Sequence, residues 1–291
     1  MEKNLFSITS LLNTFFLLLI FSAGGNAQVL QSGSFSQETT FNAEAQINFT
    51  PFQVEYTQPV SNFEPDGTQA LLYDNGSAFN VAGPPPLSVL QTALGMNSYG
   101  LSIANASNFS IADDFTLAAD ADISSIDFYS YQTGSGGVVT INAVYVRIYD
   151  GVPGSGGSVI WGDMTTNILG AASQTGGYRV LDTNTSNTDR PIQIVTANTT
   201  GLSLTAGTYW VEFSMGGTSS SGPWAPPITI TGSTATGNAL QNNGTAFTPA
   251  MDTGTNTQQG YPFQIYGDET GGGSFPSPYS KISANSIVKE K

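Results

Sequence analysis

Apolar and polar residues alternate with a period of two along much of the chain between residues 69 and 268. In "INAVYVRIYD", residues 141–150, Val144, Val146 and Ile148 fall on one face and more polar residues on the other. Such alternation is typical of half-buried β-strands. The same pattern recurs in other segments: "SIDFYSYQ", "RPIQIVTAN", "GTYWVEFSM" and "YPFQIYGD".

Glycine-rich stretches separate these segments, as in residues 133–137, 150–157 and 205–207. Many short strands with such turns predict an all-β fold, an antiparallel β-sandwich that is jelly-roll-like, over residues 69–268. We expect one short helix over residues 87–94, "LSVLQTAL", because three prolines precede it and Gly95 follows it.

The first 27 residues have the layout of a secretory signal peptide. Lys3 precedes an apolar stretch over residues 11–21, and small residues lie before a cleavage point at Gln28. A membrane anchor is the alternative, but the unbroken apolar run over residues 15–21 is far shorter than the roughly 20 residues that a spanning helix needs. We therefore expect removal of the signal and no membrane insertion afterwards.

Two further segments flank the predicted sandwich. Residues 28–68 are expected to form an N-terminal leader, ordered in part or only loosely. Residues 269–291 begin with a glycine run and are expected to form a flexible tail.

The charge is strongly acidic: the chain has 7 basic and 21 acidic residues, a formal net charge of −14. The only basic residues between Gln28 and Ser280 are Arg147, Arg179 and Arg190. Such a surface repels phosphate backbones, so nucleic acid is not an expected partner. Calcium, glycans and protein surfaces remain open as partners.

The chain contains no histidine and no cysteine. This composition excludes a Ser-His-Asp triad, cysteine nucleophiles, and zinc or copper sites built on nitrogen or sulfur. Paired carboxylates are the remaining catalytic option, and Asp127 and Glu212 are the best-placed pair if their strands are neighbours. Cross-strand charge pairs of both acids with Arg147 are the favoured interpretation.

Aromatic residues gather on the more polar face of three patterned segments. If those strands share one sheet, their side chains would form a platform for sugar rings, although ordinary cross-strand packing is the favoured interpretation. The candidate ligand-binding residues are Tyr129, Tyr131, Tyr145, Tyr149 and Trp210, with Asp127, Arg147 and Glu212 among them.

Trp224 lies in the proline-rich segment "SGPWAPP". We expect it to pack onto the end of the sandwich, with its indole N–H on a loop carbonyl. Ligand recognition at the loop tip is the alternative.

Two acidic loops are candidates for structural calcium, since carboxylate and amide oxygens suit this cation. The first has Asp182, Asn184 and Ser186 at alternate positions, followed by Asp189. The second begins at Asp113 and Asp114 and continues to residues 120–122. Simple turn formation is the competing interpretation.

Several motifs occur together in an order that resembles a β-sandwich domain of exported Bacteroidetes proteins, many of which end in a type IX secretion sorting domain. The resemblance covers roughly residues 70–268 and rests on "LLYDNGSAFN", "SNFSIADDFTL", "ISSIDFYSYQT", "VYVRIYDGVPGSGGSVIWGD", "LTAGTYWVEF", "SGPWAPPITI", "TGNALQ" and "TQQGYPFQIYG". It implies a jelly-roll-like domain outside a Gram-negative cell and transfers no catalytic residues. The tail "SFPSPYSKISANSIVKEK" is much shorter than a sorting domain, which leaves both surface attachment and release open.

The sequence therefore predicts a secreted or cell-surface, non-catalytic domain with a binding, adhesive or structural role. A carbohydrate-binding module of a glycan-degrading system is the first alternative. A glycoside hydrolase that uses Asp127 and Glu212 is the second.

Overall fold

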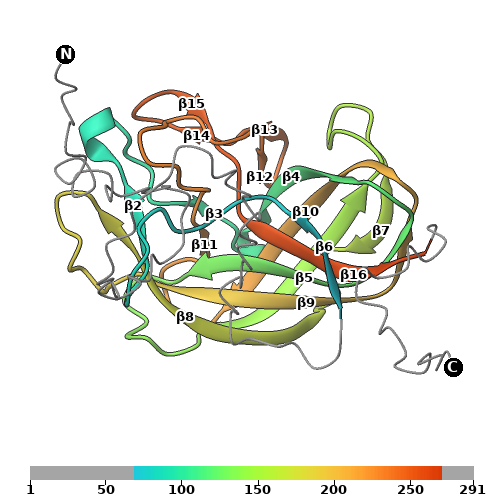
Figure 1. Cartoon of the computed structure of the whole chain (residues 1–291), viewed down its shortest axis with the longest axis horizontal. Helices are drawn as coiled ribbons and strands as arrows, with labels where there is room; N and C mark the ends of the chain where they lie inside the picture. Colours follow the sequence, from blue (N-terminus) through green and yellow to red (C-terminus); the bar gives the residue numbers. More distant parts are fainter. Residues whose placement is uncertain (1–68, 271–291) are drawn as a thin grey trace, which may run out of the picture. The chain divides into compact units, whose positions relative to one another are not determined.

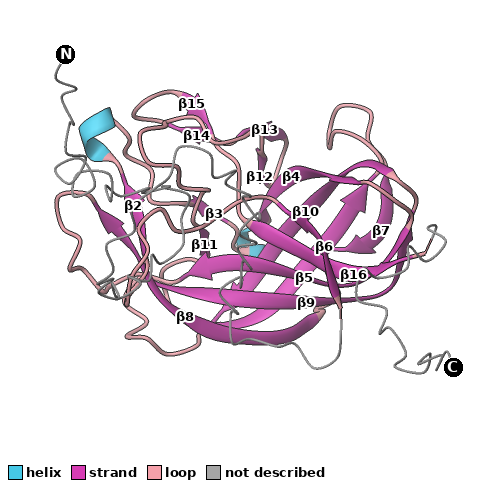
Figure 2. Ribbon diagram, viewed as in Figure 1, coloured by secondary structure: helices cyan, strands magenta, loops and turns pink. Residues whose placement is uncertain are grey.

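The fold is all-β: a computed structural model of the protein describes residues 69–270, and these form two β-sheets packed face to face (Figures 1 and 2). The predicted signal peptide, the leader and residues 271–291 of the predicted tail lie outside the described residues. The all-β sandwich predicted from the alternating pattern is confirmed.

The larger sheet has eight strands, six of which run in the order β1–β16–β5–β9–β8–β2, while β11 lies beside β5 and β3 lies beside β11. The strands are β1 (Ala70–Asp74), β2 (Leu87–Leu90), β3 (Leu101–Ser102), β5 (Ala121–Tyr131), β8 (Leu169–Leu181), β9 (Pro191–Leu204), β11 (Trp224–Ala225) and β16 (Phe263–Glu269).

The smaller sheet has six strands in the order β13–β12–β4–β10–β6–β7. They are β4 (Phe109–Leu117), β6 (Ile141–Tyr149), β7 (Val159–Asp163), β10 (Gly207–Gly217), β12 (Leu240–Asn243) and β13 (Phe247–Pro249). A separate pair joins β14 (Met251–Asp252) to β15 (Thr257–Gln258), and two 3-10 turns, η2 (Thr92–Leu94) and η3 (Asn105–Ser107), complete the elements.

The core lies between the two sheets and is made by the apolar face of each alternating strand. Val144, Val146 and Ile148 of β6 are buried there, as the sequence predicts. Phe128 of β5 stacks on Phe213 of β10 with ring centroids 4.4 Å apart, which joins the two sheets directly. Burial of such aromatic side chains removes a large apolar area from water and stabilises the sandwich.

The chain crosses repeatedly between the sheets: β4 is in the smaller sheet, β5 in the larger and β6 in the smaller again. It crosses back before β8, again between β9 and β10, and again on each side of β11. These crossings give the fold its jelly-roll-like character, and they separate strands that are near one another in sequence.

The helix predicted over residues 87–94 is wrong. Leu87–Leu90 forms strand β2, and only Thr92–Leu94 makes a 3-10 turn, which Gly95 ends in the left-handed conformation. Strand β2 pairs in parallel with β8, an exception in an otherwise antiparallel sandwich. Apolar residues at 87, 90 and 94 fit a helix and a buried strand alike, and the free edge of β8 favours the strand.

The outward face of the six-stranded sheet is covered in its central part. Trp210, Glu212 and Ser214 of β10 point away from the core by alternation, yet each is at most 7% exposed. Leu240 of β12 and Phe247 of β13 pack against Trp210 and the neighbouring Tyr149. A polar cluster is therefore buried on this face, beside the Leu240 and Phe247 side chains of the β12–β13 hairpin.

Candidate functional site

Three adjacent strands of the six-stranded sheet place a carboxylate and a guanidinium side by side. Strand β10 lies between β4 and β6, and Glu212 is paired with Ala112 on one side and Arg147 on the other. Ser110 on β4 and Tyr149 on β6 point to the same outward face, because side chains alternate along a strand.

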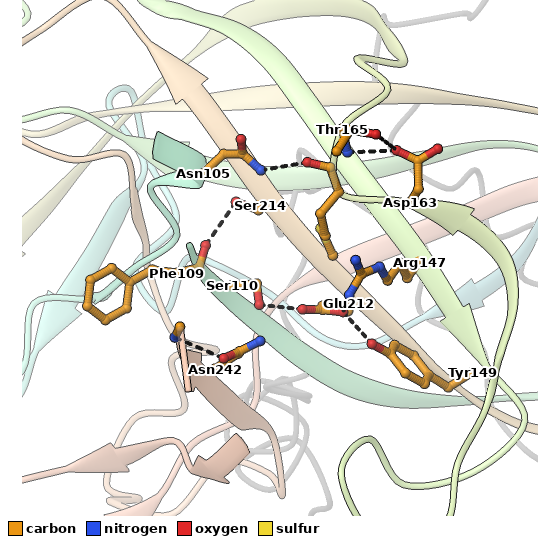
Figure 3. Close-up of polar contacts among 12 residues, drawn as sticks. Asn105, Phe109, Ser110, Arg147, Tyr149, Asp163, Thr165, Glu212, Ser214 and Asn242 are labelled. Carbon is orange, nitrogen blue, oxygen red and sulfur yellow. Dashed lines mark hydrogen bonds and ion pairs between the residues drawn. The ribbon is translucent and has the colours of Figure 1, made fainter. Parts of the chain in front are cut away.

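Glu212 is the centre of this cluster and is 1% exposed. The Ser110 hydroxyl donates a hydrogen bond of 2.6 Å to its Oε1, and the Tyr149 hydroxyl donates one of 2.6 Å to its Oε2 (Figure 3). Nη1 of Arg147 lies 3.6 Å from the same Oε2, and the Arg147 side chain is 33% exposed. Burial, reinforced by the bond to Glu212, raises the pKa of Tyr149 to about 12, so its hydroxyl keeps its proton throughout the physiological pH range.

A pocket of about 190 Å³ opens beside this pair. Its polar lining includes Glu212, Arg147, Asn105, Asn108, Asn242 and Ser214, and its apolar lining includes Phe109 and Met164. Several of these side chains are held in place (Figure 3). The Asn105 side chain donates to the Met164 backbone carbonyl at 3.1 Å, and the Ser214 hydroxyl donates to the Phe109 backbone carbonyl at 2.8 Å. The side-chain Oδ1 of Asn242 accepts the Gly244 N–H at 2.9 Å.

Hydrogen-bonding capacity remains free in this pocket. Within residues 69–270, the side chain of Asn108 and the NH₂ group of Asn242 make no hydrogen bond to the protein. Arg147 keeps N–H donors beyond the one near Glu212. The pocket therefore presents amide donors and acceptors, a cation and a carboxylate to a small ligand.

The aromatic platform, the alternative to ordinary packing, does not form, because its three strands do not share one sheet. Tyr129 and Tyr131 lie on β5 in the eight-stranded sheet, whereas Tyr145, Tyr149 and Trp210 lie on β6 and β10 in the six-stranded sheet. Tyr149 packs edge-on against Phe247, with ring centroids 6.3 Å apart, and Trp210 is buried beside it. Tyr129 packs edge-on against Phe79, and Tyr131 is buried.

The predicted carboxylate pair does not converge either. Strand β5 is bordered by β16 and β9, and β10 by β4 and β6, so Asp127 and Glu212 belong to different sheets. Asp127 accepts a hydrogen bond of 2.6 Å from Thr196, and burial raises its pKa. The expected charge pair of Arg147 is found with Glu212 alone among residues 69–270. A two-carboxylate mechanism through Asp127 and Glu212 has no geometric support.

The carboxylates of the first predicted calcium loop serve as local hydrogen-bond acceptors. Asp182 accepts from the Thr92 hydroxyl and the Ala93 N–H, which fixes the η2 turn. Asp189 accepts from the Asn187 amide at 2.9 Å. Ser186 donates to Asn184 at 3.3 Å. These contacts follow the turn-forming interpretation.

Asp113 and Asp114 are neighbours on β4 and therefore point to opposite faces of the sheet. Within residues 69–270 no group of three or more acidic side chains is close enough to hold a metal ion. Asp120 and Asp122 accept bonds from Ala206 and Ser203 respectively. Calcium binding stays a prediction that these contacts do not favour.

Asp113 is nonetheless unusual, because it is a carboxyl group inside the sandwich at 1% exposure. Its Oδ2 accepts 2.8 Å hydrogen bonds from the Asn75 amide and the Tyr261 N–H. Burial outweighs these bonds and raises the pKa of Asp113 to about 7. The folded protein therefore binds this proton more tightly than the unfolded chain does.

The raised pKa of Asp113 predicts how the stability of the fold depends on pH. Between about pH 4 and about pH 7 the unfolded chain has released the Asp113 proton and the folded protein has not, so the free energy of unfolding falls as pH rises, by up to about 1.4 kcal/mol per pH unit. We expect Asp113→Asn to lack this part of the slope in urea unfolding from pH 4.5 to pH 8. Parallel profiles for the two proteins would contradict the assignment.

Trp224 is half-buried beside Tyr131, the last residue of β5, and its indole N–H donates to the Ser221 hydroxyl at 3.3 Å and not to the expected loop carbonyl. It belongs to β11, where it pairs with Ser102 and Tyr131. It also lines a second pocket, of about 320 Å³, together with Tyr99 and Arg190.

Several residues that line the two pockets could not be recognised as candidates from the sequence. Ser110, Asn108 and Asn242 sit in ordinary polar stretches, and only the strand register brings them to Glu212. Arg179 and Arg190 could have been chosen as candidates because basic residues are rare here: they are two of the three between residues 69 and 270.

Neither models of known protein families nor curated proteins match this chain. The resemblance to exported Bacteroidetes domains therefore stays a prediction. Among the helices of residues 69–270, none combines the length and apolar character needed to cross a membrane.

Proposed function

We propose that this protein is a secreted or cell-surface, non-catalytic binding domain, and that the pocket beside Glu212 and Arg147 holds one neutral sugar residue of a glycan. The observation that carries this proposal is the convergence of a carboxylate, a guanidinium and three asparagine amides on one small pocket. Each sugar hydroxyl is both a donor and an acceptor, so a lining that offers both kinds of group suits it.

The size and rigidity of the pocket support a single sugar residue. Pockets for drug-sized ligands begin at roughly 300 Å³, and this one has about 190 Å³. The bonds of Ser110 and Tyr149 hold the Glu212 carboxylate in one orientation, which lowers the entropy lost on binding. In a glycan-degrading system such a domain would act as a carbohydrate-binding module.

Binding to a panel of neutral oligosaccharides, measured by calorimetry with and without calcium, tests the proposal. Asn108 has a φ of 58°, a conformation that glycine adopts freely. Asn108→Gly therefore removes one amide from the pocket without straining the chain. We expect this variant and Arg147→Gln to weaken binding about ten-fold, because each deletes hydrogen bonds to the sugar.

Thr116→Ala is the matched control. Thr116 is exposed on the same face of β4 as Ser110 but does not line the pocket. It should bind as tightly as the unmodified protein. If the folded protein binds no member of the panel, or if both pocket variants retain full affinity, the glycan proposal fails. A structural role for the Glu212 cluster is then the better account.

A further inference from the structure

The second pocket lies at the end of the sandwich, between the loop of residues 97–100, strand β11 and Arg190. It has about 320 Å³ and a lining that mixes aromatic rings with small polar side chains. Its lining includes the rings of Tyr99, Trp224 and Tyr131, the polar side chains of Asn97, Ser98, Thr133, Ser221 and Arg190, and Gly100.

Arg190 provides the chemistry of this pocket. Its guanidinium lies over the Tyr99 ring, with Cζ 3.7 Å from the ring centroid. Among residues 69–270 the only ion pair within 4.0 Å is Arg147–Glu212, so no carboxylate of this region neutralises Arg190. Stacking on a ring leaves the N–H groups at the edge of the guanidinium plane available, and these match a carboxylate with two parallel hydrogen bonds.

The surroundings of Arg190 are held rigidly. The buried Arg179 side chain donates to the Tyr99 carbonyl at 2.7 Å and to the Ser98 carbonyl at 3.2 Å. On the other side of the loop, Asp252 accepts the Ser98 N–H at 2.9 Å. The backbone N–H of Arg179 donates to the Arg190 carbonyl at 2.9 Å. One arginine therefore fixes both the loop and the backbone of the other arginine.

Close approach of two backbones adds to this rigidity. A Cβ at Gly100 would lie 2.4 Å from the Ala225 carbonyl oxygen, so only glycine fits between the loop and β11. This contact also fixes the position of Trp224, because Trp224 and Ala225 are the two residues of β11. The ring of Trp224 and the guanidinium of Arg190 thus line one preformed pocket.

We infer that this second pocket binds a hexuronic acid residue of a glycan, with its carboxylate on Arg190 and its ring against Trp224. A flat indole suits the apolar face of a sugar ring, and the hydroxyl and amide groups of Ser98, Thr133 and Asn97 suit its hydroxyls. An acidic peptide would satisfy Arg190 but makes no use of this combination of rings and hydroxyl partners.

The charge of the domain narrows the ligand further. Residues 69–270 contain 3 basic and 14 acidic residues, a formal net charge of 3 − 14 = −11. This field repels a densely charged polyanion. A glycan whose carboxylates are isolated single charges meets Arg190 with less repulsion than a sulfated polymer does.

The test uses the full protein without its predicted signal peptide. Calorimetry compares its binding of galacturonic or glucuronic acid trisaccharides with its binding of the same trisaccharides after their carboxyl groups are reduced to neutral hydroxyls. We expect saturable binding of at least one acidic trisaccharide and about ten-fold weaker binding of its neutral form. Arg190→Gln should remove this preference, and Arg190→Lys should restore it only in part, since lysine lacks the planar fork.

Thr116→Glu is the matched control, because it also lowers the net charge by one, and Thr116 is an exposed residue of β4 that does not line this pocket. It should keep the preference. Thermal unfolding of each variant checks that the fold is intact. Equal binding of acidic and neutral trisaccharides, no binding of either, or loss of the preference in the control overturns the inference.

Poly-glutamate and dextran sulfate test whether the pocket binds any anionic polymer and not a uronic acid in particular. If either binds as tightly as the uronic acid trisaccharides and through Arg190, the sugar assignment is overturned. The Glu212 pocket is tested separately with neutral glycans and Asn108→Gly, so failure of one proposal leaves the other standing.

Discussion

Glu212→Ala is expected to lower the free energy of unfolding by about 2–4 kcal/mol. The substitution removes the acceptor of two buried hydroxyls, those of Ser110 and Tyr149, and the partner of Arg147. A buried donor left without a partner costs about 1–3 kcal/mol. The Arg147 ion pair adds little, because a third of that side chain is exposed to solvent. Urea unfolding followed by tryptophan fluorescence measures the loss.

Glu212→Gln is the control, since it keeps one acceptor oxygen and nearly the same volume. It should cost clearly less than the alanine variant. If Glu212→Ala is as stable as the unmodified protein, water must replace the carboxylate, and the cluster does not stabilise the sheet as its hydrogen bonds suggest.

The second large effect is expected at Arg179, which is 0% exposed. Arg179→Met should lower the free energy of unfolding by about 3–5 kcal/mol, because each buried acceptor left without its donor costs about 1–3 kcal/mol. Its partners are the Tyr99 and Ser98 carbonyls and the Ser88 hydroxyl, and they would lose all three bonds. Burial lowers the pKa of Arg179, but only to about 10, so the guanidinium stays cationic at neutral pH.

A second measurement separates this role from general destabilisation. Hydrogen exchange should increase in residues 97–100 before it increases in the core strands β5 and β10, because Arg179 holds that loop. Binding of the uronic acid trisaccharides should fall as well. The opposite result, a methionine variant as stable as the unmodified protein, would mean that desolvation of the buried charge offsets its hydrogen bonds.

The strand positions could be predicted from the sequence because their signal is local. Val144, Val146 and Ile148 repeat with period two, and such a segment buries one face whatever sheet it joins. The turn at Gly95 was also predictable, because a positive φ favours glycine. The segment at Leu87 was not, because its apolar spacing fits helix and strand alike and the edge of β8 decided the outcome.

The candidate sites depended on pairing, which no local pattern contains. The residue type of Glu212 and its outward direction follow from the sequence, and so does the rarity of arginine. Only the tertiary structure decided that β5 and β10 belong to different sheets, which divides the predicted aromatic platform and separates Asp127 from Glu212. The tertiary structure alone also places Asn108 and Asn242 in one pocket with Arg147, and Tyr99 against Arg190. The alternating pattern specifies which face of a strand is buried, whereas long-range strand order specifies which side chains meet on that face.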